Sequence, residues 1–192
     1  MIASNSQISS FAEISFIRRY IYDKSMSLKK DKKLVFQSLK TDKYLKRLNI
    51  NFEKIVEKSI LDHKPVEISL YKNIILHYSK NQWVVDKDPN LIELLPILHS
   101  MFSNAIIINM IRDPRDILLS KKKAKWSRSG HAWKHVFANL NQIYFSNKYG
   151  KSLFGENYVE IKYENLISET KSTLKSLCNK ININFEKKMM DY

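Results

Sequence analysis

The chain has 192 residues, 44% of them hydrophobic, with only three glycines and four prolines, so it is neither disordered nor low in complexity. Its formal net charge of +14 favours an anionic ligand, an acidic acceptor or nucleic acid, without choosing among them. No apolar run approaches the ~18 residues that span a bilayer. The N-terminus lacks a secretory signal, so we expect no membrane anchor and a cytoplasmic location by default. The single cysteine, Cys178, excludes an intramolecular disulfide.

The first 82 residues read as mainly helical. Apolar residues at helical spacing follow a polar start, at Phe11, Ile14, Ile17 and Ile21. Residues 24–33 form a lysine-rich polar segment, which we expect to be a solvated linker. Residues 34–81 again show helical periodicity, so the stretch 24–82 predicts a helical insertion before the first clear strand.

Three short apolar runs then predict strands of a mostly parallel sheet. Trp83–Val85 and Ala105–Ile111 are too short for buried helices, and they read as strands buried on both faces. The apolar segment 90–102 predicts the helix that joins them in a right-handed crossover. Tyr158–Lys162 predicts a third strand, nearer an edge. A helix over 131–148 should turn one face inward, with Trp133, Val136, Phe137, Leu140, Ile143 and Tyr144.

Each of the first two strands stops at a cation. The first is followed by Lys87 and the second by Arg112. In open α/β sheets, ligands bind outside the carboxyl ends of the strands. Two cations delivered to that edge predict an anionic ligand.

A helix start follows Arg112. Asp113 is a good N-cap and Pro114 suits the first helical position. Ser120 lies seven residues after the cap, on the same face and about 10 Å further along the axis. An arginine at a strand end and a hydroxyl two turns into the next helix suit the binding of one phosphate group from two directions.

These residues carry a resemblance to a known family. The segment Arg-Asp-Pro-Arg-Asp-x-x-x-Ser after an apolar strand resembles the 3′-phosphate-binding segment of sulfotransferases that use 3′-phosphoadenosine-5′-phosphosulfate (PAPS). The preceding Asp-Lys-Asp-Pro is similar to the lysine-bearing segment of protein-tyrosine sulfotransferases. Ser-Gln-Ile-Ser-Ser-Phe-Ala-Glu, residues 6–13, resembles their segment with a glutamate base. Tyr-Glu-x-Leu, from residue 163, is similar to a segment whose tyrosine lies against the adenine.

The resemblance implies a fold and a set of site residues. The fold would be a three-layer α/β domain like that of P-loop kinases, with a central, mostly parallel sheet. Glu13 would be the general base and Lys87 the catalytic lysine. Arg112 and Ser120 would bind the 3′-phosphate of PAPS, the co-substrate, and Tyr163 would contact its adenine.

Parts of the family's pattern have no counterpart in this chain. The family's first strand and phosphosulfate-binding loop should precede Glu13 by ~25–30 residues, which the chain does not contain. The family also continues beyond the equivalent of Tyr192. We therefore expect residues 1–192 to form a single but incomplete sulfotransferase domain. No histidine or cysteine spacing indicates a metal site, so no metal is expected.

Alternatives remain beside sulfuryl transfer to an acceptor hydroxyl, which a protein tyrosine, an acidic peptide or a glycan would carry. One is a non-catalytic module that retains only a 3′-phosphonucleotide half-site. Another is a basic nucleic-acid-binding protein, which would use the lysine-rich run Lys121–Arg128 with Trp126 stacking on bases. For that run, and for Glu13 and Tyr163, ordinary surface or core roles compete with the functional ones.

Overall fold

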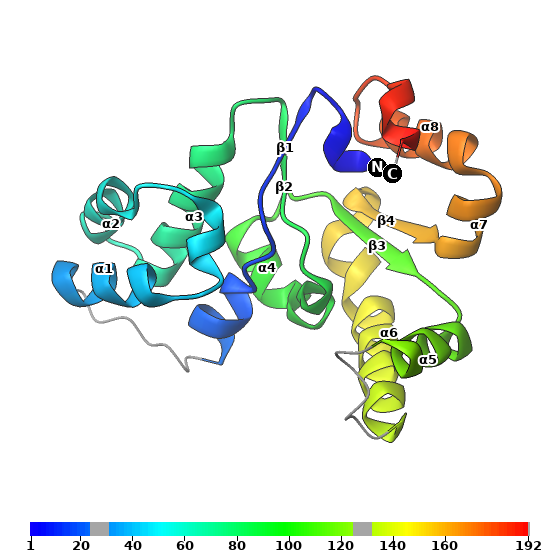
Figure 1. Ribbon diagram of the computed structural model, residues 1–192, viewed down its shortest axis with the longest axis horizontal. Coiled ribbons are helices and arrows are strands. Elements are labelled where there is room, and N and C mark those ends of the chain that lie inside the picture. Colours follow the sequence, from blue (N-terminus) through cyan, green and yellow to red (C-terminus); the bar gives the residue numbers. More distant parts are fainter. Residues whose placement is uncertain (24–30, 125–131, 192) are drawn as a thin grey trace. The chain divides into compact units, whose positions relative to one another are not determined.

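The computed structural model describes residues 1–23, 31–124 and 132–191. These residues form two compact units, one made of Met1–Leu91 with Glu186–Tyr192 and the other of Ile92–Phe185. Both contain a pair of parallel strands and several helices (Figure 1). The predicted mixture of helices and parallel strands is therefore confirmed.

The first unit carries the strands β1 (Ile8–Ser10) and β2 (Trp83–Val85), which pair in parallel. Between them lie a π-helix, a short 3-10 turn and three α-helices; their bounds are η2 Ile17–Tyr22, α1 Lys32–Thr41, η3 Leu45–Leu48, α2 Phe52–Ile60 and α3 Val66–Tyr78. The short turns η1 (Ile2–Ser4) and η7 (Lys187–Met190) contact each other, since the Ser4 hydroxyl donates to the carbonyl of Lys188.

Helices α1 to α3 pack against one another, as Figure 1 shows, because each has an apolar face that must leave water. Asp31 caps α1 and Asn51 caps α2, each accepting a hydrogen bond of 2.9 Å from a backbone N–H in the first turn. The fully buried side chains of this core include Val35, Leu39, Leu45, Val56, Leu70 and Ile74. The helical character predicted for residues 34–81 is thus confirmed.

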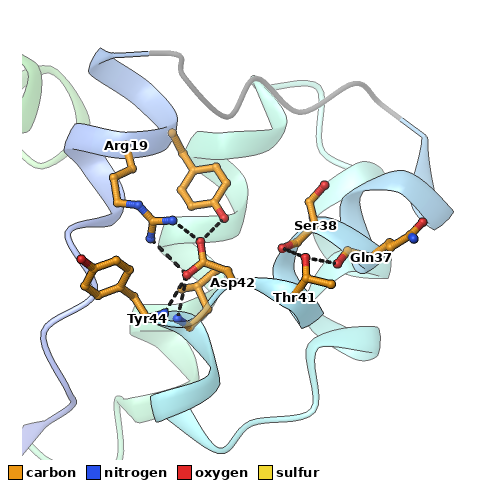
Figure 2. A network of polar contacts seen from close by, with 8 residues as sticks. Arg19, Gln37, Ser38, Thr41, Asp42 and Tyr44 are labelled. Atoms are coloured by element: carbon orange, nitrogen blue, oxygen red, sulfur yellow. Dashed lines mark hydrogen bonds and ion pairs between the residues drawn. The ribbon is translucent and has the colours of Figure 1, made fainter.

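A buried carboxylate fastens the π-helix η2 to this helical layer (Figure 2). Asp42, whose side chain is fully buried, pairs with the Arg19 guanidinium and accepts a hydrogen bond of 2.6 Å from the Tyr20 hydroxyl. The backbone N–H groups of Tyr44 and Leu45 also donate to it. Burial alone would raise the pKa of Asp42, but the hydrogen bonds from Arg19 and Tyr20 outweigh burial and lower it.

The second unit carries β3 (Ile107–Ile111) and β4 (Tyr158–Lys162), which also pair in parallel. The 3-10 turn η4 (Pro89–Leu94) leads into it. Its helices are α4 Leu95–Met101, α5 Pro114–Lys123, α6 Ala132–Phe154, α7 Tyr163–Ser168 and α8 Thr170–Lys180, with the short turn η6 Gly155–Asn157 before β4. Helix α5 lies along α6 (Figure 1). Cys178 is buried in α8.

Three sequence-based expectations were wrong in detail. The first is the helix around Phe11: the strand β1 and an irregular turn precede η2 there. Second, β2 and β3 are only partly buried, and Met110 is 48% exposed. Third, the predicted inner face of α6 is largely exposed, at Trp133, Phe137, Leu140, Ile143 and Tyr144. Periodicity identifies an apolar face but not what covers it.

A close contact between α6 and β4 holds the second unit together. The ring of Tyr158 lies so near Gly150 that a Cβ there would sit 2.5 Å from a ring carbon. The Tyr158 hydroxyl lies 2.7 Å from the Ser146 hydroxyl and accepts from the Asn109 amide at 2.9 Å. Strand β4 and its neighbour β3 are thereby fixed against the long helix.

We expect Gly150→Ala to lower the free energy of unfolding by about 1–3 kcal/mol, the usual cost of forcing a methyl group into a packed interior. The better helix propensity of alanine offsets only part of this. Denaturant unfolding measures the effect. Gly155→Asn is the control, since no atom lies within 4 Å of its would-be Cβ and asparagine tolerates its positive φ. An unchanged midpoint for Gly150→Ala would contradict the packing described.

Candidate functional site

Parallel pairing brings the residues that follow two strands to one edge. In the first unit, Ser10 pairs with Val85, so the chain leaves β1 and β2 at the same end. Glu13 lies three residues beyond the end of β1 and Lys87 two residues beyond the end of β2. Residues 74 positions apart in the sequence are thus brought together.

Glu13 and Lys87 form an ion pair at this edge. The Lys87 Nζ lies 2.6 Å from Oε2 of Glu13. The lysine side chain is 73% exposed and that of the glutamate 36% exposed. An exposed pair of this kind contributes little to folding, about 0–1 kcal/mol. Its two members therefore remain accessible to a ligand at little cost in stability.

Asp86 directly precedes Lys87 in the chain, and its role was not foreseen from the sequence. The hydroxyl of Tyr71, on α3, donates a hydrogen bond of 2.5 Å to Oδ2 of Asp86. The other oxygen, Oδ1, is out of contact with water and has no hydrogen-bond partner among the described residues. Burial raises the pKa of Asp86 to about 6; the Tyr71 hydrogen bond lowers it in part, while the charges of Asp88 and Glu13 raise it further.

The raised pKa of Asp86 predicts a specific pH dependence of stability. Between about pH 4 and about pH 6, the folded protein keeps a proton on Asp86 that the unfolded chain has lost. The stabilisation is therefore complete below the ordinary aspartate pKa and is lost as the pH rises through 6. The loss is on the order of 3 kcal/mol for a shift of this size.

Asp86→Asn should remove this dependence, because an amide accepts the Tyr71 hydrogen bond without titrating. Unfolding free energies of both proteins, measured from pH 4 to pH 8, give the difference directly. We expect the variant to gain stability relative to the wild type as the pH rises to 6, and the difference to be flat above it. A difference that does not change over this range would contradict the burial of a charged Asp86.

The second unit brings Arg112 and Tyr163 together in the same way. Ile111 pairs with Lys162 at the ends of β3 and β4, so the next residues on both strands are neighbours. The Arg112 guanidinium lies over the Tyr163 ring, 4.5 Å from its centroid, a favourable cation–π distance. Within the described parts of the chain, Arg112 forms no ion pair with a carboxylate, and its Nε has no hydrogen-bond partner.

The turn after Arg112 is closed by hydrogen bonds on both sides. The Asp113 carboxylate accepts from the backbone N–H of Arg115 at 2.8 Å and pairs with the Arg115 guanidinium at 2.6 Å, which confirms the predicted N-cap of α5. These contacts with Arg115 lower the pKa of Asp113 to about 2. The backbone N–H of Asp113 donates to Oε1 of Glu164 at 3.0 Å. The Arg115 guanidinium is thus ion-paired with a carboxylate, whereas the Arg112 guanidinium lies over the Tyr163 ring.

Ser120 is less closely tied to Arg112. It lies exposed in the second half of α5. Of the lysine-rich run, Lys121–Lys123 belong to α5, whereas positions 125–128, with Trp126 and Arg128, lie outside the described residues.

Other features of the described residues bear on cofactors and ligands. No group of three or more metal-ligating side chains occurs there, and no helix in that part of the chain is long and apolar enough to cross a membrane.

A groove of about 700 Å³ lies between β4 and α8. It is lined by polar side chains, among them Asn165, Thr173 and Lys180, and contains none of the five predicted site residues.

Both units thus have short parallel strands with a cation just beyond a carboxyl end, an arrangement typical of α/β proteins that bind ligands at this edge. A family model described as "Sulfotransferase family" matches residues 1–187. The chain therefore belongs to the sulfotransferase family, as its motifs predicted. It is a transferase, and sulfuryl transfer is its general class of reaction.

A solved structure described as "Sulfotransferase Domain from the Curacin Biosynthetic Pathway" resembles the chain, with a TM-score of 0.60 at 17% identity. The match covers 98% of this chain and 70% of that one. At this identity it supports the sulfotransferase α/β fold and nothing finer. A comparison with curated proteins gives no match.

Proposed function

We propose that this sulfotransferase transfers the sulfuryl group of PAPS to an acceptor hydroxyl, with Lys87 and Glu13 at the reacting centre. The observation that carries the proposal is the ion pair between Lys87 and Glu13 at the carboxyl end of β1 and β2. The dyad unites a proton acceptor with a cation that can stabilise a developing negative charge. These are the two groups that sulfuryl transfer to a hydroxyl requires.

In the proposed reaction, the acceptor oxygen attacks sulfur while the bond from sulfur to the phosphate oxygen breaks. Glu13 takes the proton of the attacking hydroxyl, and the displaced oxygen leaves on the 5′-phosphate of 3′,5′-bisphosphoadenosine. Lys87 donates a hydrogen bond to that oxygen as its charge grows. When PAPS binds, its 5′-phosphate first replaces Glu13 as the partner of Lys87. This exchange frees the glutamate to act as a base.

The second half of the proposal concerns the nucleotide. Arg112 is a guanidinium without an ion-pair partner among the described residues, which suits a 3′-phosphate. Ser120 would supply a hydroxyl to the same phosphate from α5. One face of the Tyr163 ring is covered by Arg112, so we propose that the adenine contacts the ring elsewhere. The Tyr163 ring would then contact both the Arg112 guanidinium and the adenine.

The acceptor is proposed as a hydroxyl on a protein tyrosine, an acidic peptide or a glycan. The positive net charge of +14 favours acidic acceptors within this set. The Asp-Lys-Asp-Pro segment around Lys87 favours the protein-tyrosine group by resemblance. A non-catalytic nucleotide-binding module is the alternative that the assays below distinguish.

Arg112→Ala should weaken binding of 3′,5′-bisphosphoadenosine by about tenfold to a hundredfold, the usual loss for a charge-assisted contact. Binding of 5′-adenosine monophosphate, which lacks the 3′-phosphate, should change little. Isothermal titration calorimetry measures both. Arg47→Ala is a matched control, because Arg47 also lies over a tyrosine ring, that of Tyr44, but in the other unit. Equal affinity of the wild type and Arg112→Ala would refute the assignment.

Lys87→Gln and Glu13→Gln should each lower the rate of sulfuryl transfer by about a hundredfold or more. Transfer of labelled sulfate from PAPS to a tyrosine peptide and to a glycan measures this and identifies the acceptor class. The control is Lys180→Gln, which removes another exposed lysine from an ion pair, that with Glu156. A wild type that binds the nucleotide but transfers nothing to either acceptor would favour the non-catalytic module.

A further inference from the structure

We propose that Glu164 is a positioning residue of the Arg112 half-site, acting through the backbone amide of Asp113. This inference rests on the proposed function, since it assumes that Arg112 binds the 3′-phosphate. Glu164 is the acid of the Tyr-Glu-x-Leu segment, but the sequence assigns a role there only to the tyrosine. Its contact across the two strand ends gives it this role.

Two consecutive residues after β4, Tyr163 and Glu164, contact two consecutive residues after β3, Arg112 and Asp113. We call this pair of contacts the clamp. Because β3 and β4 are parallel and in register to their last residues, the chain segments that follow them run side by side. Tyr163 lies under the guanidinium of Arg112, and Glu164 accepts the N–H of Asp113 at 3.0 Å. One strand end thus holds both the side chain of Arg112 and the backbone just after it.

The clamp fixes the direction in which Arg112 leaves the strand. Asp113 is held on one side by Glu164 and on the other by its own cap of α5, through Arg115. A free arginine at a strand end would lose rotamer freedom when it bound a phosphate, at a cost in affinity. A guanidinium that already lies over an aromatic ring, on a backbone held in place, loses less rotamer freedom on binding.

The charge and the hydrogen bond of Glu164 have opposite effects on phosphate binding by Arg112. The pKa of Glu164 is lowered mainly by the Asp113 N–H, then by its own backbone N–H, and also by the charge of Arg112. The carboxylate is therefore ionised at neutral pH, and its negative charge opposes an arriving phosphate. Replacement by glutamine removes the charge but retains an oxygen that can accept the same N–H. Replacement by alanine removes both.

The first test needs no ligand. In a ¹⁵N NMR titration of the wild type, the amide of Asp113 should report the ionisation of Glu164 below the ordinary glutamate range. In Glu164→Gln this step should vanish, while any shift caused by the Asp113 carboxyl itself should remain near pH 2. An Asp113 amide whose titration is the same in both proteins would overturn the contact.

The second test is calorimetric binding of 3′,5′-bisphosphoadenosine, with 5′-adenosine monophosphate as the reference ligand. Glu164→Ala should bind the bisphosphate about threefold to tenfold more weakly, as expected when a preorganised side chain becomes mobile. Glu164→Gln should bind as well as the wild type or more tightly. Neither variant should change the affinity for the monophosphate. Glu156→Ala, which removes another exposed glutamate of the same unit, is the control.

The outcomes separate the two proposals. If the wild type shows no preference for the bisphosphate, both the proposed 3′-phosphate site and the role of Glu164 fall. If it does show that preference but Glu164→Ala binds normally, only the positioning role falls. Equal losses in Glu164→Ala and Glu164→Gln would also overturn it, because the hydrogen bond that glutamine preserves would then have no effect.

Discussion

Parallel pairing of very short strands is the constraint on which both proposed half-sites depend. A parallel pair must end at one edge, so residues far apart in the sequence meet there without any direct connection. Strands of three and five residues suffice, because the register continues to their last residues. The proposed site residues follow shortly beyond that point, where side chains no longer belong to the sheet. The helices supply the packing that such short strands cannot provide for themselves.

Two aspartates of the first unit, Asp42 buried and Asp86 partly buried, differ in how their charges are satisfied. Asp42 fastens the π-helix that follows Glu13, and five donated hydrogen bonds keep it charged. Among the residues that the structure describes, Asp86 has only the Tyr71 hydroxyl as a donor, so burial dominates and its pKa rises. The two aspartates show that the number of donors, rather than burial alone, decides whether a carboxylate stabilises the fold at neutral pH. Asp86, which accepts fewer hydrogen bonds than Asp42, directly precedes the proposed catalytic lysine, Lys87.

Much of the architecture could be predicted from local patterns. Strands β2 and β4 begin and end where their apolar runs do, and the Asp113-Pro114 start of α5 follows from capping rules. Strand β1 was missed because Ile-Ser-Ser carries a single apolar residue, and only its pairing with β2 makes it a strand. Asp86 and Glu164 were missed for a related reason. An acid beside a strand end acquires a role only through a partner from another element, which periodicity does not identify.

The ion pair between Glu13 and Lys87 has a consequence for the proposed reaction. Each group neutralises the other while no donor is bound, so neither side chain is left as an isolated charge. Because the pair is exposed, separating it costs only about 0–1 kcal/mol, which a single charge-assisted bond from Lys87 to a phosphate offsets. A buried pair at the same position would resist this exchange with a penalty of several kcal/mol. Exposure of the dyad therefore favours a role in a reaction where the lysine must change partners in every turnover.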